Sequence, residues 1–134
     1  MAKQLQCVVV TPERAVLDAP VDFVALPMYD GELGVLPGRA PLIGRLGYGE
    51  LRTVSGPQTR RYFVDGGFTE VRADVVTVLT ARAIPAEEIQ IPAAEAALQA
   101  ALKPAPMAEA QEGQWKAQQR ARTQLQIARR VQEP

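Results

Sequence analysis

Residues 30–42 read Asp-Gly-Glu-Leu-Gly-Val-Leu-Pro-Gly-Arg-Ala-Pro-Leu, with three glycines and two prolines in thirteen residues. Glycine adopts backbone conformations that other residues avoid, and proline fixes its own backbone angle, so an irregular loop between strands is expected here. A phosphate-binding loop would need a following Lys-Ser or Lys-Thr pair and the start of a helix, and neither is expected. The pattern therefore favours turn chemistry with a tip that contacts another protein.

Short apolar segments separated by turn residues extend on both sides of this loop, from Gln4 to about Ile84. Turn signals recur every 8–12 residues or so, which is typical of a β-sandwich or barrel. The Gly47-Tyr48-Gly49 and Asp65-Gly66-Gly67 segments are among the predicted turns. The candidate strands are Gln4–Val10, Arg14–Ala19, Val21–Met28, Leu33–Leu36, Leu42–Leu46, Gly49–Ser55, Arg61–Val64, Phe68–Arg72 and Val75–Ala81. Residues 1–85 are therefore predicted to form a β-sandwich of about nine or ten strands.

Two strands carry more specific information about the core. Leu5, Cys7 and Val9 would share one face of the first strand, so Cys7 is expected to be a buried small hydrophobe rather than a reactive thiol. Both faces of Val75–Thr80 are largely apolar, which suits an interior strand of the sheet.

The composition changes after Pro85, where thirteen of the last 49 residues are alanine, the strongest helix former. A first helix is predicted from about Pro92 to Lys103, followed by a stiff Pro104-Ala105-Pro106 connection and a second helix from about Met107 to Val131. Residues 86–134 are thus predicted to form an antiparallel helical hairpin. The predicted contact stripe of the second helix is Ala110, Ala117, Ala121, Leu125 and Ala128. An alanine seam buries little apolar area, so the hairpin is expected to separate easily from the sheet domain.

Composition excludes several classes of function. The chain has no histidine and one serine, so the usual triads and histidine metal sites are impossible, and we expect no enzyme activity, metal or cofactor. Fifteen basic and fifteen acidic residues balance, which gives no general support for nucleic-acid binding. No apolar run approaches the roughly 20 residues that span a bilayer, and the N-terminus lacks a signal-peptide pattern, so an intracellular protein is expected. A free-standing structural adaptor and a nucleic-acid-binding module remain the alternatives.

The order of four segments is more specific than any one of them. Residues 31–42, then Gly-Glu-Leu-Arg at 49–52, then Asp-Gly-Gly-Phe-Thr-Glu-Val at 65–71, then the strand at 75–84, closely resemble the epsilon subunit of the F-type ATP synthase. The resemblance runs from Leu5 to Ile84 and continues beyond it only in architecture. It implies a non-catalytic subunit of the central stalk, or rotor, which couples proton flow through the membrane ring to ATP synthesis.

The resemblance also implies partners and contact residues. Members bind the gamma subunit and sit on the ring of c subunits, which implies a peripheral protein, membrane-associated only through the complex, at the cytoplasmic face of the bacterial inner membrane. Glu32 and Arg39 stand at the family's ring-contact positions; the family often has His where this chain has Arg39. The C-terminal hairpin of bacterial members can inhibit ATP hydrolysis, which would make the alpha and beta catalytic subunits partners of the second helix. The basic residues expected to contact them are Arg120, Arg122, Arg129 and Arg130.

Some members bind ATP in the folded hairpin through Ile or Leu, then Asp, then Arg-Ala three residues later. The matching stretch here is Ile91-Pro92-Ala93-Ala94-Glu95-Ala96, in which Pro92 replaces the Asp and Glu95 replaces the Arg. This change removes a positive charge that a phosphate would need, so the sequence predicts no ATP binding.

Overall fold

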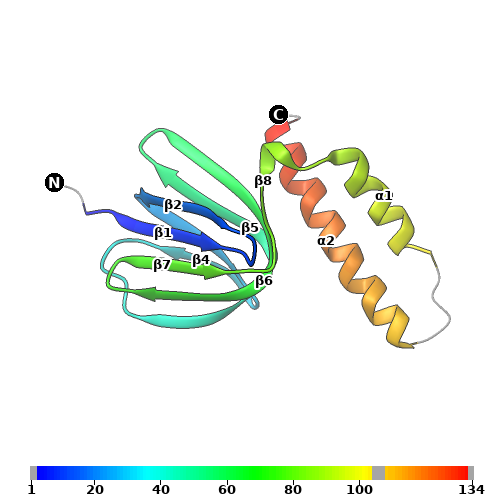
Figure 1. Ribbon diagram of the computed structural model, residues 1–134, viewed down its shortest axis with the longest axis horizontal. Coiled ribbons are helices and arrows are strands. Elements are labelled where there is room, and N and C mark those ends of the chain that lie inside the picture. The colour runs from blue at the N-terminus through cyan, green and yellow to red at the C-terminus, as the bar shows by residue number, and fades with distance from the viewer. Residues whose placement is uncertain (1–2, 104–107, 133–134) are drawn as a thin grey trace. The chain divides into compact units, whose positions relative to one another are not determined.

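The computed structural model describes residues 3–103 and 108–132 (Figure 1). The chain divides into two compact units, residues 1–85 and residues 86–134, and each is treated by itself. Residues 104–107, which include the predicted stiff connection, lie outside the described residues, as do the side chain of Ala110 and the predicted start of the second helix at Met107.

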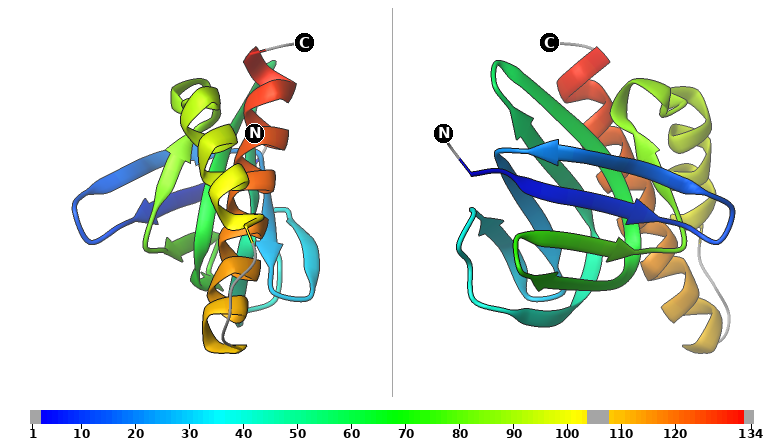
Figure 2. Two further views of the ribbon diagram at one scale, coloured as in Figure 1. Left: turned by 90° about the vertical axis from the view of Figure 1, so that its right-hand side faces the viewer. Right: turned by 60° about the vertical axis from the view of Figure 1, so that its left-hand side comes forward.

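The described part of the first unit forms one mixed sheet of eight strands, in the order β2-β1-β7-β6-β5-β3-β4, with β8 paired to β6. The strands are β1 (Leu5–Val10), β2 (Ala15–Val21), β3 (Phe23–Met28), β4 (Gly31–Val35), β5 (Leu42–Ser55), β6 (Gln58–Arg72), β7 (Val75–Leu79) and β8 (Ala83–Pro85). Neighbours pair antiparallel except β1 and β7, which are parallel. The sheet curves on itself (Figure 2), and this is the predicted β-sandwich.

The core lies between the inner faces of the curved sheet. Leu5, Cys7 and Val9 are buried together, as the alternation in the first strand predicts. They pack with Leu26, Leu51 and other aliphatic side chains from the remaining strands. Val76 and Val78 of β7 are also buried, and β7 lies between β1 and β6, which confirms the prediction of an interior strand. The eight strands thus enclose one aliphatic core.

The predicted turn at Gly47-Tyr48-Gly49 is wrong, because these residues lie inside β5. A Cβ at Gly49 would stand 2.5 Å from the Cβ of Pro27, and one at Gly47 would stand 3.4 Å from the Met28 oxygen. The glycines therefore let β3 cross close to β5, where the register between the two strands shifts. Two predicted strands are in fact one long strand.

The predicted turn at Asp65-Gly66-Gly67 is also wrong, because β6 runs through it. Gly66 and Gly67 both have positive φ, at 69° and 107°, which only glycine adopts without cost. This bend redirects β6 from its pairing with β8 at residues 62–64 to its pairing with β7 at residues 68–72. The short strand β8, which pairs with the first of these segments, was not predicted.

The second unit is a helical hairpin of α1 (Ile91–Ala101) and α2 (Ala108–Gln132), preceded by a 3-10 turn at Ala86–Glu88. The two helices lie side by side (Figure 1), as predicted. Helix α1 ends at Ala101, two residues earlier than predicted. Ala94 and Ala101 of α1 are buried, and so are Ala121, Leu125 and Ala128 of the predicted α2 stripe. Ile127 is buried as well, although it falls outside that stripe.

Glutamine side chains of α2 complete the hairpin. Gln118 Nε2 donates to the Ala101 oxygen at 2.9 Å, close to the end of α1, where backbone carbonyls lack helical partners. Gln132 Nε2 donates to the Ala86 and Ile89 oxygens at 2.9 and 3.0 Å. Uncharged hydrogen bonds near both ends of the hairpin therefore supplement its alanine seam.

Candidate interaction surfaces

The loop that holds Arg39 borders a shallow groove. The groove has a volume of about 430 Å³ and is lined by Phe23, Gly34, Leu36, Pro37, Gly38 and Arg39. Leu36 is 60% exposed, and the Arg39 side chain is exposed as well. The arrangement offers an open apolar surface with a permanent positive charge at its border, which suits a protein segment rather than an enclosed small molecule.

A side chain from the β6–β7 turn fixes the conformation of the Arg39 loop. Gly38 N donates to Asp74 Oδ1 at 2.8 Å, and Arg39 N donates to the Leu36 oxygen at 3.3 Å. Gly38 has a φ of 87°, so the turn needs a glycine at this position. These contacts hold the irregular loop that the glycines and prolines predict in one conformation.

Glu32, the second predicted contact residue, lies on β4 opposite Pro27 of β3. Its Oε1 stands 3.5 Å from Arg52 Nη2, and its side chain is 56% exposed. Glu32 is therefore an exposed carboxylate within an ion pair, and no local sequence pattern indicates a partner that is twenty residues away. Glu32 does not line the Arg39 groove, although Gly34, two residues further along β4, does.

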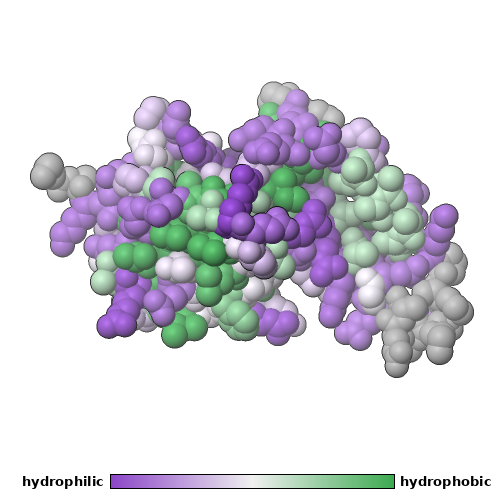
Figure 3. All heavy atoms as spheres, in the orientation of Figure 1, coloured by the Kyte–Doolittle hydropathy of each residue, from purple (hydrophilic) through white to green (hydrophobic). Residues whose placement is uncertain are grey.

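An exposed apolar surface lies on the outer face of β5, β6 and β7, and we call it the apolar face. Phe68 of β6 is directly opposite Leu79 of β7, and their side chains are 60% and 54% exposed. Ile43 of β5 is 77% exposed, and Val75 of β7 is exposed on the same face, four residues before Leu79. Figure 3 shows hydrophobic atoms gathered over the part of the sheet where Figure 1 draws β1 and β7.

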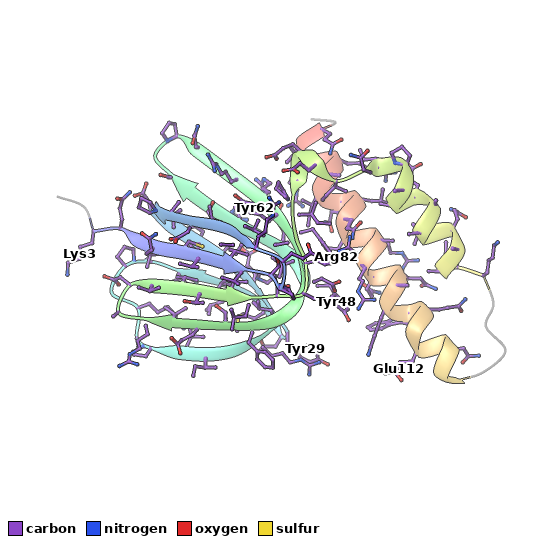
Figure 4. All side chains as sticks on the ribbon, in the orientation of Figure 1. Lys3, Tyr29, Tyr48, Tyr62, Arg82 and Glu112 are labelled. Atoms are coloured by element: carbon purple, nitrogen blue, oxygen red, sulfur yellow. The ribbon has the colours of Figure 1, made fainter. Side chains whose placement is uncertain are left out.

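Polar side chains lie both beside and within the apolar face. Arg45 is opposite Phe68, and its guanidinium carbon lies 4.4 Å from the ring centroid of Tyr29, which projects from the β3–β4 turn (Figure 4). Glu70 is opposite both Ile43 and Thr77, so this carboxylate lies among the apolar side chains rather than at their border. Large exposed apolar side chains gathered on one face mark contact sites for other proteins. The sequence carries a signal for this surface, since both faces of β7 are apolar, but a strand that is buried on both faces has the same pattern.

The four predicted arginines of α2 differ in their surroundings. Arg122, Arg129 and Arg130 are exposed, whereas Arg120 is half-buried. Arg129 Nη2 pairs with Glu95 Oε1 of α1 at 2.9 Å. The structure therefore does not present the four as one uniform basic surface.

The stretch that corresponds to the nucleotide motif borders an open pocket of about 420 Å³. Pro92 and Glu95 of α1 and Leu125 and Arg129 of α2 are among its lining residues. Arg129 of α2 places a positive charge at this pocket, but its guanidinium pairs with the carboxylate of Glu95, the residue that replaces the motif's arginine. An incoming phosphate would have to displace this carboxylate, so the geometry favours the predicted lack of ATP binding.

The remaining reactive group is a core thiol. Burial raises the pKa of the Cys7 thiol to about 12, and the negative charge of Asp18 adds to the rise. Cys7 is fully buried and free of disulfides, so its position and pKa fit the predicted structural role. Within residues 3–103 and 108–132, no group of three or more acidic or cysteine side chains could hold a metal ion. No helix in the same ranges is both long and apolar enough to cross a bilayer.

The comparisons with known proteins agree with the fold. Residues 4–86 match the family model for the β-sandwich domain of the ATP synthase delta/epsilon chain. The ATP synthase epsilon chain of Rhodopirellula baltica is 57% identical over 129 residues, which cover 93% of this chain and 98% of that one. The epsilon chain of Carboxydothermus hydrogenoformans is 44% identical over 101 residues, or 75% of each chain. The chain belongs to the family of ATP synthase epsilon chains.

Two solved structures share this fold. A chain of the mitochondrial ATP synthase OSCP/F1/c-ring structure of Euglena gracilis superposes with a TM-score of 0.82 at 25% identity, covering 90% of this chain and 78% of that one. A chain of the central stalk and c-ring structure from Tetrahymena thermophila gives a TM-score of 0.73 at 10% identity, covering 95% and 98%. The protein is thus an epsilon-type subunit that works within the membrane-bound ATP synthase complex, as the resemblance implied.

Proposed function

We propose that this chain is a non-catalytic rotor subunit, which binds the gamma shaft through the apolar face of its sheet and rests on the c ring through Glu32 and Arg39. In this position it couples proton flow through the ring to ATP synthesis at the cytoplasmic face of the bacterial inner membrane. It is peripheral and reaches the membrane only through the complex. The observation that supports the shaft contact best is the apolar face, because large exposed side chains such as Phe68 and Ile43 need a partner to cover them.

The size of the expected contact follows from Phe68. A phenylalanine side chain can bury about 200 Å², and the 60% of Phe68 that is exposed would contribute about 3 kcal/mol when a partner covers it. Phe68→Asp should therefore weaken binding to the purified gamma subunit about 100-fold, measured by titration calorimetry with the full chain.

Leu36→Asp is the matched control, because Leu36 is equally exposed but lies in the Arg39 groove. This variant should bind gamma like the unmodified protein. Equal losses in the two variants would mean that binding is not confined to the apolar face, and normal binding by Phe68→Asp would remove the proposed contact altogether. Thermal unfolding of both variants controls for loss of fold.

We further propose that the hairpin is a mobile regulatory unit, whose α2 arginines contact acidic segments of the alpha and beta catalytic subunits. The support is its construction, since small alanine side chains make up much of the seam between α1 and α2, and the Glu95–Arg129 ion pair across it is exposed. Truncation after Leu102 in the assembled complex should leave assembly intact and raise ATP hydrolysis. An unchanged hydrolysis rate would show that the hairpin does not inhibit this enzyme.

A further inference from the structure

Four side chains of alternating charge form a row on one face of the sheet, across β6, β5 and β4. Arg61 Nη1 donates to both oxygens of Glu50 at 3.0 Å. Arg52 Nη1 lies 3.9 Å from the second of these oxygens, and Arg52 Nη2 lies 3.5 Å from Glu32 Oε1. The Glu50 side chain is only 11% exposed, whereas that of Glu32 is 56% exposed. The row therefore contains one well-covered carboxylate, Glu50, and ends at an open one, Glu32.

Small residues beneath Arg52 let its side chain reach β4. Ala25 of β3 lies between Arg52 on β5 and Gly34 on β4 in one register row, so the three positions share a face. Ala25 is fully buried and has only a methyl group, and Gly34 has no side chain. A longer side chain at either position would block the path from Arg52 to Glu32.

An aromatic ring supports the same guanidinium. The Arg52 guanidinium carbon lies 5.9 Å from the centroid of the Phe23 ring, at the outer range of a cation–π contact. The Phe23 ring lies against Gly34, where an added Cβ would stand 3.0 Å from a ring carbon. Glu50, Phe23 and the small residues beneath thus define where the guanidinium sits.

We propose that Arg52 is a positioning residue for Glu32: it holds one carboxylate oxygen and so orients the other toward the partner. Within the described residues, Glu32 Oε2 has no hydrogen bond or ion pair of its own. A side chain with a fixed orientation loses less rotamer freedom on binding, which improves affinity without any direct contact by Arg52. The inference rests on the proposed function, because it needs Glu32 to touch the ring.

The test is a double-mutant cycle on ring binding. The complex of the gamma shaft with the full chain is titrated against the purified c ring in lipid nanodiscs, and the dissociation constant is compared for the unmodified chain, Glu32→Gln, Arg52→Gln and the double variant. Arg52→Gln alone should weaken binding about 3- to 10-fold, the cost of ordering one free side chain. In the Glu32→Gln background the same change should have no further effect, because Arg52 acts through Glu32.

Two further variants separate charge from packing. Arg52→Met keeps an apolar stem over Phe23 and removes the charge, so it should weaken binding as much as Arg52→Gln. Arg52→Lys keeps the charge without the planar fork and should restore part of the affinity. Thermal unfolding of each variant identifies any that fail to fold. The dissociation constants for the c ring are then compared among the Arg52 variants that do fold.

The outcomes distinguish the inference from the proposed function. If Glu32→Gln weakens ring binding but the Arg52 effect is absent or simply additive, the positioning role is wrong and the ring contact stands. If Arg52→Met binds like the unmodified chain, packing rather than charge is what matters, and the inference is again wrong. If Glu32→Gln binds normally, the ring contact of Glu32 and the inference that depends on it both fall.

Discussion

Replacing Gly67 by alanine tests the bend in β6 that carries the sheet from β8 to β7. An alanine Cβ at this position would stand 2.0 Å from the Leu79 oxygen and 2.9 Å from the Thr80 Cα, and both are backbone atoms that cannot rotate away. The φ of 107° adds about 1–2 kcal/mol of backbone strain. The end of β7 must also be displaced, so Gly67→Ala should lower the free energy of unfolding by about 4 kcal/mol in total. This is a large fraction of the stability of a typical domain.

Gly66→Ala is the matched control for this prediction. Gly66 also has a positive φ, at 69°, but the nearest atom to an added Cβ is 3.7 Å away, on the Tyr48 ring. Only the backbone cost of about 1 kcal/mol should remain. Urea unfolding of the full chain, followed by far-ultraviolet circular dichroism, gives both free energies of unfolding. If the two variants agree within about 1 kcal/mol, β7 does not approach β6 as closely as described.

Three further predictions concern other parts of the chain. The pKa of the Cys7 thiol is about 12 in the folded chain and about 9 in the unfolded chain, so this group should not affect stability below pH 9. Above pH 9 it should lower the free energy of unfolding, by about 1.4 kcal/mol at pH 10. Urea unfolding of Cys7→Ala between pH 8 and 10 should therefore show a flatter decline than the unmodified chain, and parallel curves would contradict the burial of Cys7. Gln132→Ala removes two hydrogen bonds and should destabilise the hairpin by about 1–2 kcal/mol. The fluorescence of Trp115, the chain's one tryptophan, should then change at a lower urea concentration. An unchanged transition would mean that these bonds do not hold the hairpin. Calorimetry should detect no ATP binding tighter than about 1 mM, and a smaller dissociation constant would show that the Glu95–Arg129 pair opens for phosphate.

Much of the first unit follows from the sequence because side chains alternate along its strands. The apolar series Leu5, Cys7 and Val9 placed β1 correctly, and the alanine-rich composition after Pro85 indicated the helical hairpin. Glycine is more ambiguous, because the same residue serves in a turn, in a close approach of two strands and in a left-handed bend. Gly47 lies where two strands approach closely, and Gly67 combines a close approach with a left-handed bend. A turn predicted at each glycine therefore divides β5 and β6 into two predicted strands apiece.

The candidate surfaces depend on contacts between segments that are distant in sequence. The pairing of Glu32 with Arg52 and of Gly38 with Asp74 follows from strand register, which no local pattern fixes. The apolar face was missed for a different reason. An apolar residue on the outer face of a strand has the same sequence signal whether it is buried in the fold or exposed to a partner, and only the three-dimensional sheet shows that Phe68 is open to solvent.

The central claim, that this chain turns with the shaft, is tested most directly by single-molecule rotation. The catalytic subunits of the assembled complex are fixed to a surface, and a bead is attached to this chain through a cysteine that replaces the exposed Lys3. With ATP supplied, the bead should rotate in one direction at the rate of a bead attached to gamma. A stationary bead on this chain, in complexes whose gamma subunit rotates, would contradict the account.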